Sequence, residues 1–186
     1  MPNGAQLVAT HARAGADVDA RVTHTGPHGS PETALHWAAS SDDVAVLDAL
    51  LDHGADIEAT GAVFTNCAPM SDAVVFAQWR AARRLLERGA ATTLWQAAAL
   101  GVIERVRACC AQPDAPTVAQ LTNALWHACR GGQLEVAELL IDRGADPNWI
   151  GHDHKTALDV AQENDARALV TWLLARGARS AHDRQR

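Results

Sequence analysis

Two short stretches decide the fold: Thr33-Ala34-Leu35-His36-Trp37-Ala38-Ala39 and, after an apolar segment, Gly54-Ala55-Asp56-Ile57-Glu58. Thr33 is suited to cap a helix, because its hydroxyl can accept a hydrogen bond from a free amide of the first turn. Leu35 and Ala38 then recur at helical spacing. A second helix is predicted over the apolar segment and ends at Gly54, which adopts the left-handed conformation easily. One such helix pair cannot bury its own apolar face, so copies must stack.

The same unit recurs along the chain. Gly-Ala-Asp begins at Gly15, Gly54 and Gly144, with degenerate forms at Gly89 and Gly177. An apolar residue followed three positions later by alanine marks the start of each unit, at Leu35/Ala38, Met70/Ala73, Leu94/Ala97, Leu125/Ala128 and Leu158/Ala161. Repetition at 24 to 35 residues predicts a repeat protein.

These residues resemble the ankyrin repeat, in which a T-P-L-H-x-A-A opening leads to two helices, G-A-D-V-N and a β-finger. The match is equally good where Gly144-Ala145-Asp146-Pro147-Asn148 leads to Thr156-Ala157-Leu158-Asp159-Val160-Ala161. The resemblance extends from about Val8 to Ala178 and implies an all-α solenoid of stacked helix-turn-helix units with short β-finger loops. The predicted division of the single domain, 1–186, is a half-repeat with a long finger at 8–32, repeats at 33–67, 68–92, 93–122, 123–155 and 156–180, and a tail at 181–186.

Composition excludes several classes of protein. No apolar run approaches the roughly 18 residues of a membrane-spanning helix, and Met1-Pro2-Asn3-Gly4 does not open a secretory signal. Four cysteines in 186 residues do not make a disulfide scaffold, and a net charge of -6 disfavours nucleic acid as a partner. We therefore expect a cytoplasmic protein. Its 39 alanines, and 15 arginines against one lysine, predict a GC-rich bacterial genome.

The repeats are irregular, and the irregularities are the pointers to function. The first finger carries a long insertion, His24 to Pro31, whereas the finger between Gly89 and Leu94 has vanished. This predicts a notch near the third and fourth units, since insertions in repeat proteins fall on one face. At the N-terminus, Val8 to Ala14 aligns with an outer helix whose inner helix is missing. The edge of the next repeat should then be only partly covered, which indicates either a natural start further upstream or a docked partner.

In the ankyrin family, finger tips and the exposed ends of the inner helices line a concave groove that binds partner proteins. Carried over, this implies groove positions in the last finger and helix, at Ile150, His152, Asp153, Lys155, Glu163 and Asn164. The same carry-over exposes Ser40, Ser41, Val75, Phe76, Ala99, Leu100, Arg130 and Gly131. Val75, Phe76 and Leu100 would make an apolar floor for a partner peptide or helix. Trp149 is either an interface hot spot or a shield that folds onto a neighbouring finger or loop.

Other aromatic and charged residues have structural interpretations. The resemblance implies that His36 hydrogen-bonds between repeats. Trp95 and Trp126 replace that histidine in later units and are interpreted as space-filling. Three more tryptophans are expected in the core or in helix packing, at Trp37, Trp79 and Trp172. Four arginines of one outer helix are interpreted as a solvated face, with an acidic partner as second choice, at Arg80, Arg83, Arg84 and Arg88.

The sequence also contains candidate residues for metal binding and for catalysis. Two short-spaced histidine pairs could ligate a metal, at His24/His28 and His152/His154. Cys109 or Cys110 could pair with His127 as thiolate and imidazole. However, Cys109 and Cys110 occupy apolar positions of an outer helix, and Cys129 occupies an apolar position of an inner helix. The sequence contains no known catalytic motif. The sequence predicts a monomeric, non-enzymatic module that binds a partner protein without metal or cofactor. The rivals are a metal-dependent or small-molecule-binding protein or enzyme that uses the histidine loops and the notch, and a structural fragment of a longer chain.

Overall fold

The computed structural model describes residues 3–23, 31–61 and 67–183. It divides into two compact units, which are unit 1 (Met1–Ala91) and unit 2 (Thr92–Arg186). Each unit consists of short helices stacked in pairs, so the predicted all-α fold of helix-turn-helix units is confirmed. The units are described one at a time below, and the assignment of residues 1–186 to a single domain stays a prediction.

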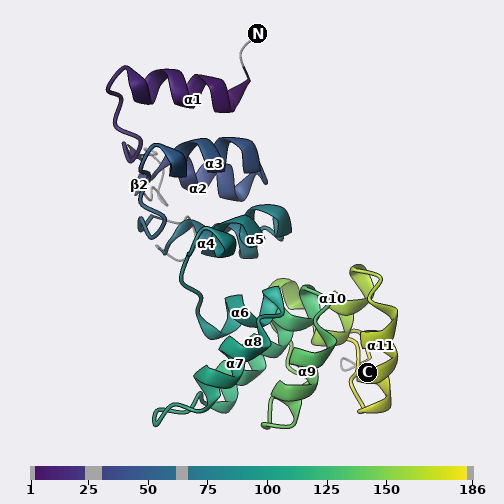
Figure 1. The fold of residues 1–186 in the computed structure, drawn as a ribbon. Coiled ribbons are helices and arrows are strands. Elements are labelled where there is room, and N and C mark those ends of the chain that lie inside the picture. Colours follow the sequence, from purple (N-terminus) through teal and green to yellow (C-terminus); the bar gives the residue numbers. More distant parts are fainter. Residues whose placement is uncertain (1–2, 24–30, 62–66, 184–186) are drawn as a thin grey trace. The chain divides into compact units, whose positions relative to one another are not determined.

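Unit 1 begins with a lone helix and continues with two helix pairs (Figure 1). Its elements are α1 (Gly4–Arg13), β1 (Val22–Thr23), β2 (Pro31–Glu32), α2 (Ala34–Ser40), α3 (Val44–Asp52), α4 (Pro69–Val75) and α5 (Trp79–Glu87). The inner helix α2 packs against α3 of its own repeat and against α4 of the next, and α3 packs against α5. The two short strands pair antiparallel, with Val22 opposite Glu32.

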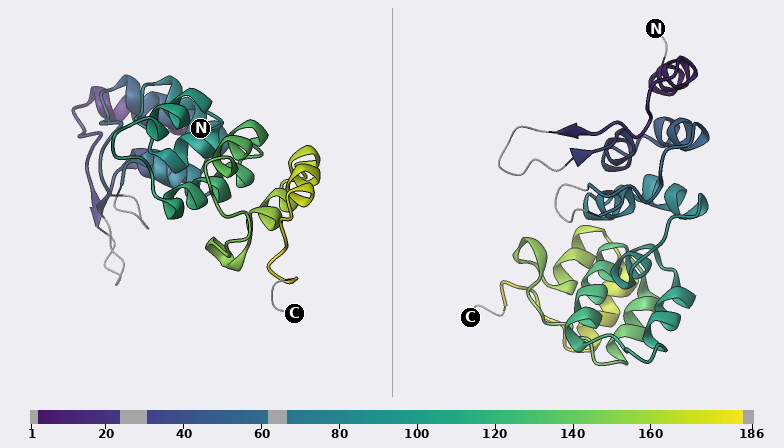
Figure 2. Two further views of the ribbon diagram at one scale, coloured as in Figure 1. Left: turned by 90° about the horizontal axis from the view of Figure 1, so that it is seen from below. Right: turned by 90° about the vertical axis from the view of Figure 1, so that its left-hand side faces the viewer.

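The lone helix α1 packs against α3. The right-hand view of Figure 2 shows α1 lying over α3, with no helix over α2. This is the arrangement of an outer helix without its inner partner, as the alignment of Val8 to Ala14 predicts. None of the residues of α1 is buried, because the helix has a neighbour on one side only.

Unit 2 holds three helix pairs and the last finger. Its elements are α6 (Leu94–Leu100), α7 (Ile103–Cys110), α8 (Val118–Arg130), α9 (Leu134–Ile141), the 3-10 turn η1 (His152–His154), α10 (Ala157–Glu163) and α11 (Arg167–Ala175). A continuous core joins α6, α8 and α10, and its largest members include Leu125, Trp126 and Leu140. The helix α8 starts five residues before the predicted repeat boundary at 123, because Thr117 and Gln120 form a capping box there.

Local sequence explains where the inner helices begin. Thr33 caps α2 together with His36 at the third helical position, and Thr156 caps α10 together with Asp159 in the same way. Such reciprocal bonds satisfy amides that have no partner within the helix. Thr33 is the N-cap of α2 as predicted, and its bonds are made with His36, whose Nδ1 accepts from the Thr33 amide at 3.2 Å and lies 2.9 Å from the Thr33 hydroxyl oxygen.

Three of the four arginines in and just after α5 form ion pairs with the preceding repeat, although Arg80 and Arg84 stay well exposed. Arg88 lies 3.0 Å from Asp48 and 2.8 Å from Asp52, both on α3, and Arg84 lies 3.6 Å from Asp48. Arg80 is 3.8 Å from Asp42. The basic helix therefore faces the acidic residues of the repeat beside it, as its ion pairs show.

Two expectations about burial are wrong. Ala99 was expected to face the groove but is 1% exposed, because the backbone of Gly131 approaches its carbonyl so closely that a Cβ there would overlap it. Trp37 was expected in the core or in helix packing, yet it is 48% exposed, because no helix covers α2 on that side. Trp79 and Trp172 are half-buried.

Candidate binding surface

The finger between α9 and α10 presents two large apolar side chains. Trp149 and Ile150 are each 36% exposed. The ring of Trp149 lies over Gly151, where even a Cβ would overlap the ring. Its indole also meets the imidazole of His152 edge-on, at 5.8 Å between ring centroids. Trp149 therefore folds onto its own finger and still keeps a third of its surface in solvent.

His152 connects this finger to the inner helices. Its ring centroid lies 5.0 Å from that of Trp126 and 5.4 Å from that of His127. Its Nε2 is hydrogen-bonded to Oδ1 of Asn123 at 3.0 Å. The ring centroid of His127 in turn lies 4.6 Å from that of Trp95. We call these rings the aromatic cluster of unit 2, formed by Trp95, Trp126, His127, Trp149 and His152.

His127 is the buried member of the aromatic cluster. It is 5% exposed, and its Nδ1 has no hydrogen-bond partner among the described residues. Burial lowers its pKa to about 3, and the nearby His152 and Arg130 add to this effect. The imidazole is therefore neutral near pH 7. Sequence analysis missed His127 as part of this surface, although the adjacent aromatic pair Trp126-His127 was a visible signal.

Trp126 occupies the position of His36 in its own repeat, and it forms the corresponding hydrogen bond as well as filling the space. Its Nε1 donates to the carbonyl oxygen of Lys155 at 3.0 Å. In unit 1, Nε2 of His36 is hydrogen-bonded to the carbonyl oxygen of Cys67 at 3.1 Å. Each carbonyl belongs to the residue just before the N-cap of the next inner helix. The expected link made by His36 is present, and Trp126 makes the corresponding link as well as filling space.

Charged and polar side chains lie around the aromatic cluster. Lys155 pairs with Glu163 at 2.6 Å, and Nδ2 of Asn164 donates to the carbonyl oxygen of Arg130 at 2.7 Å. The guanidinium of Arg130 lies 5.6 Å from the Trp126 ring centroid, within cation–π range. Its pKa is lowered by burial. Asp153 is exposed on the same finger.

The structure thus brings several of the expected groove residues together in unit 2. Trp149 and His152 touch through their rings, Lys155 pairs with Glu163, and Asn164 contacts Arg130. Ile150 and Asp153 lie exposed beside them in the chain. In unit 1, Phe76 is 40% exposed and Val75 half-buried, and in unit 2 Leu100 is half-buried. The apolar floor expected from these three, and the notch, stay predictions.

The described residues give little support to metal or thiol chemistry. Within residues 3–23, 31–61 and 67–183, no three His, Cys, Asp or Glu side chains are grouped as metal ligands. His24 and His28 lie outside the described residues. Burial raises the pKa of Cys129 to about 12 and also raises that of Cys110. Such thiols stay protonated near pH 7 and are poor nucleophiles.

Comparison with known proteins agrees with this architecture. A family profile described as "Ankyrin repeats (3 copies)" matches residues 94–183, and a single "Ankyrin repeat" profile matches residues 32–62. An ankyrin repeat and KH domain-containing protein of Caenorhabditis briggsae is 32% identical over 168 residues, which is 86% of this chain and 6% of that protein. The E3 ubiquitin-protein ligase hecd-1 of Caenorhabditis elegans is 37% identical over 75 residues, or 40% of this chain and 3% of the ligase.

A solved structure, the human ASB11 ankyrin repeat domain, is similar with a TM-score of 0.44 and 23% identity, covering 80% of this chain and 71% of that domain. Compared with the two nematode proteins, the chain is short and spans only a small fraction of their length. In the part of the chain that the structure describes, no helix has both the length and the apolar character needed to cross a membrane.

Proposed function

The chain is built from ankyrin repeats, which are generally protein–protein interaction modules, and on this premise we propose that it binds a partner protein through the concave face of unit 2. The proposed contact residues are those around the last finger. They are Trp149, Ile150, His152, Asp153, Lys155, Glu163, Asn164 and Arg130. Leu100, at the end of the inner helix α6, extends the proposal within unit 2. Val75 and Phe76, at the end of α4 in unit 1, are proposed as a separate contact.

The observation that carries the proposal is the finger of unit 2, where Trp149 and Ile150 are both a third exposed beside a charged rim. A side chain of this size in solvent contributes strongly to affinity when a partner covers it. The finger is also held in place, because Trp149 rests on Gly151 and His152 is bonded to Asn123. A surface ordered before binding loses less entropy on association.

A non-enzymatic role fits the chemistry of this face better than catalysis. The buried imidazole of His127 has its pKa lowered to about 3, so it is a weak base near pH 7. The thiol of Cys129 is 0% exposed, with its pKa raised to about 12. A catalytic site would need a nucleophile and a base that are accessible and matched to the working pH, and these two groups are neither.

The proposals on compartment, oligomeric state, cofactor and origin rest on the sequence. We place the protein in the cytoplasm from its composition and cysteine content, and we propose that it acts as a monomer without a cofactor. The bias toward alanine and arginine supports a bacterial origin, whereas the two nematode proteins show only that the repeats themselves are shared more widely.

The test is affinity capture from the native host with four versions of the chain, followed by direct binding of each captured protein. Trp149→Ala and Ile150→Ala should each weaken binding by about tenfold or more, as truncation of a buried interface residue does. Leu174→Ala is the matched control, because Leu174 is 54% exposed on the outer helix α11. Circular dichroism checks that all versions are folded. If every captured protein binds Trp149→Ala and Ile150→Ala as it binds the parent chain, the proposal is wrong.

A further inference from the structure

The finger of unit 2 carries an exposed tryptophan that has no cation beside it. Two other tryptophans of this unit each have an arginine over the ring. Arg130 lies 5.6 Å from the Trp126 ring centroid, and Arg176 lies 4.7 Å from that of Trp172. Among the described residues, no arginine or lysine lies over Trp149, although a third of its surface is in solvent. Because the face of an indole attracts cations, Trp149 is open to a cation from outside the chain.

A carboxylate without a partner lies four residues further along the same finger. Asp153 is exposed in the turn η1, and among the described residues its side chain forms no ion pair and accepts no hydrogen bond. The other charged groups of the finger are engaged. Lys155 pairs with Glu163 at 2.6 Å, and the carboxylate of Asp146 accepts from a backbone amide at 2.8 Å. The finger therefore offers one unengaged negative charge.

The ring of Trp149 and the carboxylate of Asp153 lie near the same aromatic cluster. The Trp149 ring meets that of His152, which is the residue next to Asp153. Burial lowers the pKa of Arg130, and the charge of Asp153 opposes this effect, so the carboxylate is within electrostatic reach of the cluster. Consecutive Cα atoms are only about 3.8 Å apart. One long cationic side chain can therefore contact both groups.

The turn that carries Asp153 is held in place before a partner binds. Nε2 of His152 is hydrogen-bonded to Oδ1 of Asn123 at 3.0 Å, and the amide of Lys155 donates to the carbonyl oxygen of His152 at 3.1 Å. The φ of Asp153 is +53°, a conformation that aspartate and asparagine adopt more readily than most residues. A site ordered in this way loses less entropy when a ligand binds.

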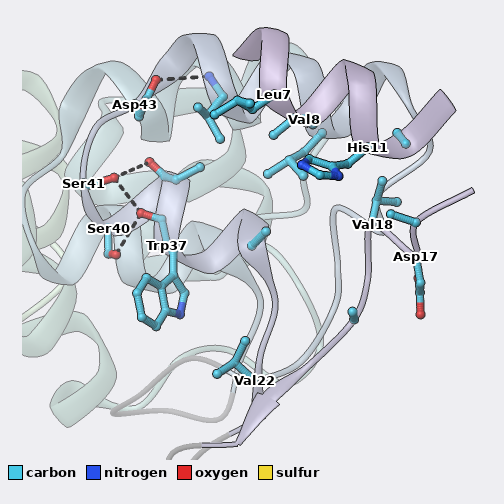
Figure 3. Close-up of a pocket in the computed structure, with 17 residues that line it drawn as sticks. Leu7, Val8, His11, Asp17, Val18, Val22, Trp37, Ser40, Ser41 and Asp43 are labelled. Carbon is cyan, nitrogen blue, oxygen red and sulfur yellow. Dashed lines mark hydrogen bonds between the residues drawn. The ribbon is translucent and has the colours of Figure 1, made fainter. Parts of the chain in front are cut away.

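Exposure of a tryptophan does not by itself make such a site. In unit 1, Trp37 is 48% exposed beside a pocket of about 780 Å³ between α1 and α2 (Figure 3). The two carboxylates that line this pocket accept hydrogen bonds within the chain. Asp17 accepts from the amide of Asp19, and Asp43 accepts from that of Val46. An exposed tryptophan with an unengaged carboxylate distinguishes the finger of unit 2 from this pocket.

We infer that the finger of unit 2 binds an arginine side chain of the partner protein, with the guanidinium stacked on Trp149 and hydrogen-bonded to the carboxylate of Asp153. The inference rests on the proposed function, whose contact residues include both, and it names the chemistry that the partner presents. A guanidinium suits this pair better than an ammonium, because it is planar and weakly hydrated and can stack on a ring while it donates to a carboxylate.

The test uses a blocked tripeptide, acetyl-glycyl-arginyl-glycine amide, and two matched peptides in which citrulline or lysine replaces the arginine. Citrulline has the shape of arginine without its charge. Each peptide is titrated into the full isotope-labelled chain at low salt, and NMR follows the indole N–H signals of Trp149 and Trp172. The arginine peptide should bind at Trp149 about fivefold more tightly than the citrulline peptide, because only the guanidinium adds a cation–π contact and an ion pair. Trp172 should not respond, since Arg176 already lies over its ring.

A charge-removing variant locates the carboxylate. Asp153→Asn keeps a residue that tolerates positive φ, and it should abolish the preference for arginine over citrulline. The matched control is Asp114→Asn, which removes an exposed carboxylate in the loop between α7 and α8 and should keep the preference. High salt should reduce the preference in the parent chain, because it screens exposed charges.

Equal binding of the arginine and citrulline peptides at Trp149, or an arginine preference that survives Asp153→Asn, would overturn the inference. A lysine peptide that binds as tightly as the arginine peptide would also overturn it, because the site would then select a positive charge and not a guanidinium. None of these results affects the loss of a captured protein in Trp149→Ala. The inference and the proposed function can therefore fail separately.

Discussion

His127 shows at the scale of one residue how the aromatic cluster of unit 2 is organised. Its imidazole lies among the rings of Trp95, Trp126 and His152 at centroid distances of 4.6 to 5.4 Å. Its Nδ1 has no partner among the described residues. A buried polar atom without a hydrogen bond costs stability, and protonation of this ring would cost more. Protonation of His127 at low pH should therefore destabilise the folded state.

The first prediction concerns the pH dependence of stability. The folded-state pKa of His127, about 3, lies below the reference value of 6.5, so the unfolded chain takes up a proton on this ring first as pH falls. His127 therefore destabilises the folded state progressively below about pH 6.5, by about 2 kcal/mol at pH 5 relative to pH 8. His127→Gln removes the titrating group, and urea denaturation at the two pH values should show a loss smaller by about that amount.

Part of the acid sensitivity should remain in His127→Gln. Burial also lowers the pKa of His36, so its protonation opposes folding in the same direction. An acid-induced loss of stability that is identical in His127→Gln and in the parent chain would show that His127 is not protonated on unfolding, and would contradict the prediction.

At the scale of the element, the contact between α6 and α8 depends on a missing side chain. Gly131 follows α8 directly, and its backbone lies against the carbonyl of Ala99 at the end of α6. Gly131 and Gly132 lie between α8 and α9. The spacing of residues within one repeat does not show that Gly131 also sets how closely α6 and α8 approach, since this depends on the neighbouring repeat.

The second prediction tests this close approach. A Cβ at position 131 would overlap the backbone of Ala99, so Gly131→Ala should lower the free energy of unfolding by about 1–3 kcal/mol, as overpacking does. The control is Gly132→Ala, whose Cβ would meet nothing within 4 Å, although φ of +72° makes that residue strained. Only Gly131→Ala should shift the NMR signals of Ala99. A Gly131→Ala chain with the urea midpoint of the parent and an unshifted Ala99 would rule out the steric account.

At the scale of the whole molecule, the chain divides into two compact units. Unit 2 has one continuous hydrophobic core that runs from Ala97 to Ala178 and draws on all of its helices. Unit 1 has a lone helix without buried residues at one end and the open pocket beside it. Stability in repeat arrays is close to a sum of repeat and interface contributions, so a unit that lacks one interface should be the weaker one.

The third prediction follows from this division. A fragment of residues 92–186 should fold by itself and show a cooperative urea transition by circular dichroism, because its core is complete within the fragment. A fragment of residues 1–91 should unfold at a lower urea concentration. If residues 92–186 give a non-cooperative transition, or if residues 1–91 prove the more stable fragment, this ranking of the two units is wrong.

The sequence alone determined the repeat, the helix caps and much of the finger surface, because these depend on local spacing. The spacing of Thr33 and His36, and the position of Trp149 in the finger, are fixed by the chain itself and do not depend on tertiary contacts. Tertiary structure decided which surfaces are open. Trp37 and Ala99 differ in exposure from what was predicted for them, because the exposure of an inner helix depends on which helices pack beside it. In a stacked array, the burial of a side chain depends on the interface between neighbouring repeats, so the sequence of one repeat does not determine it.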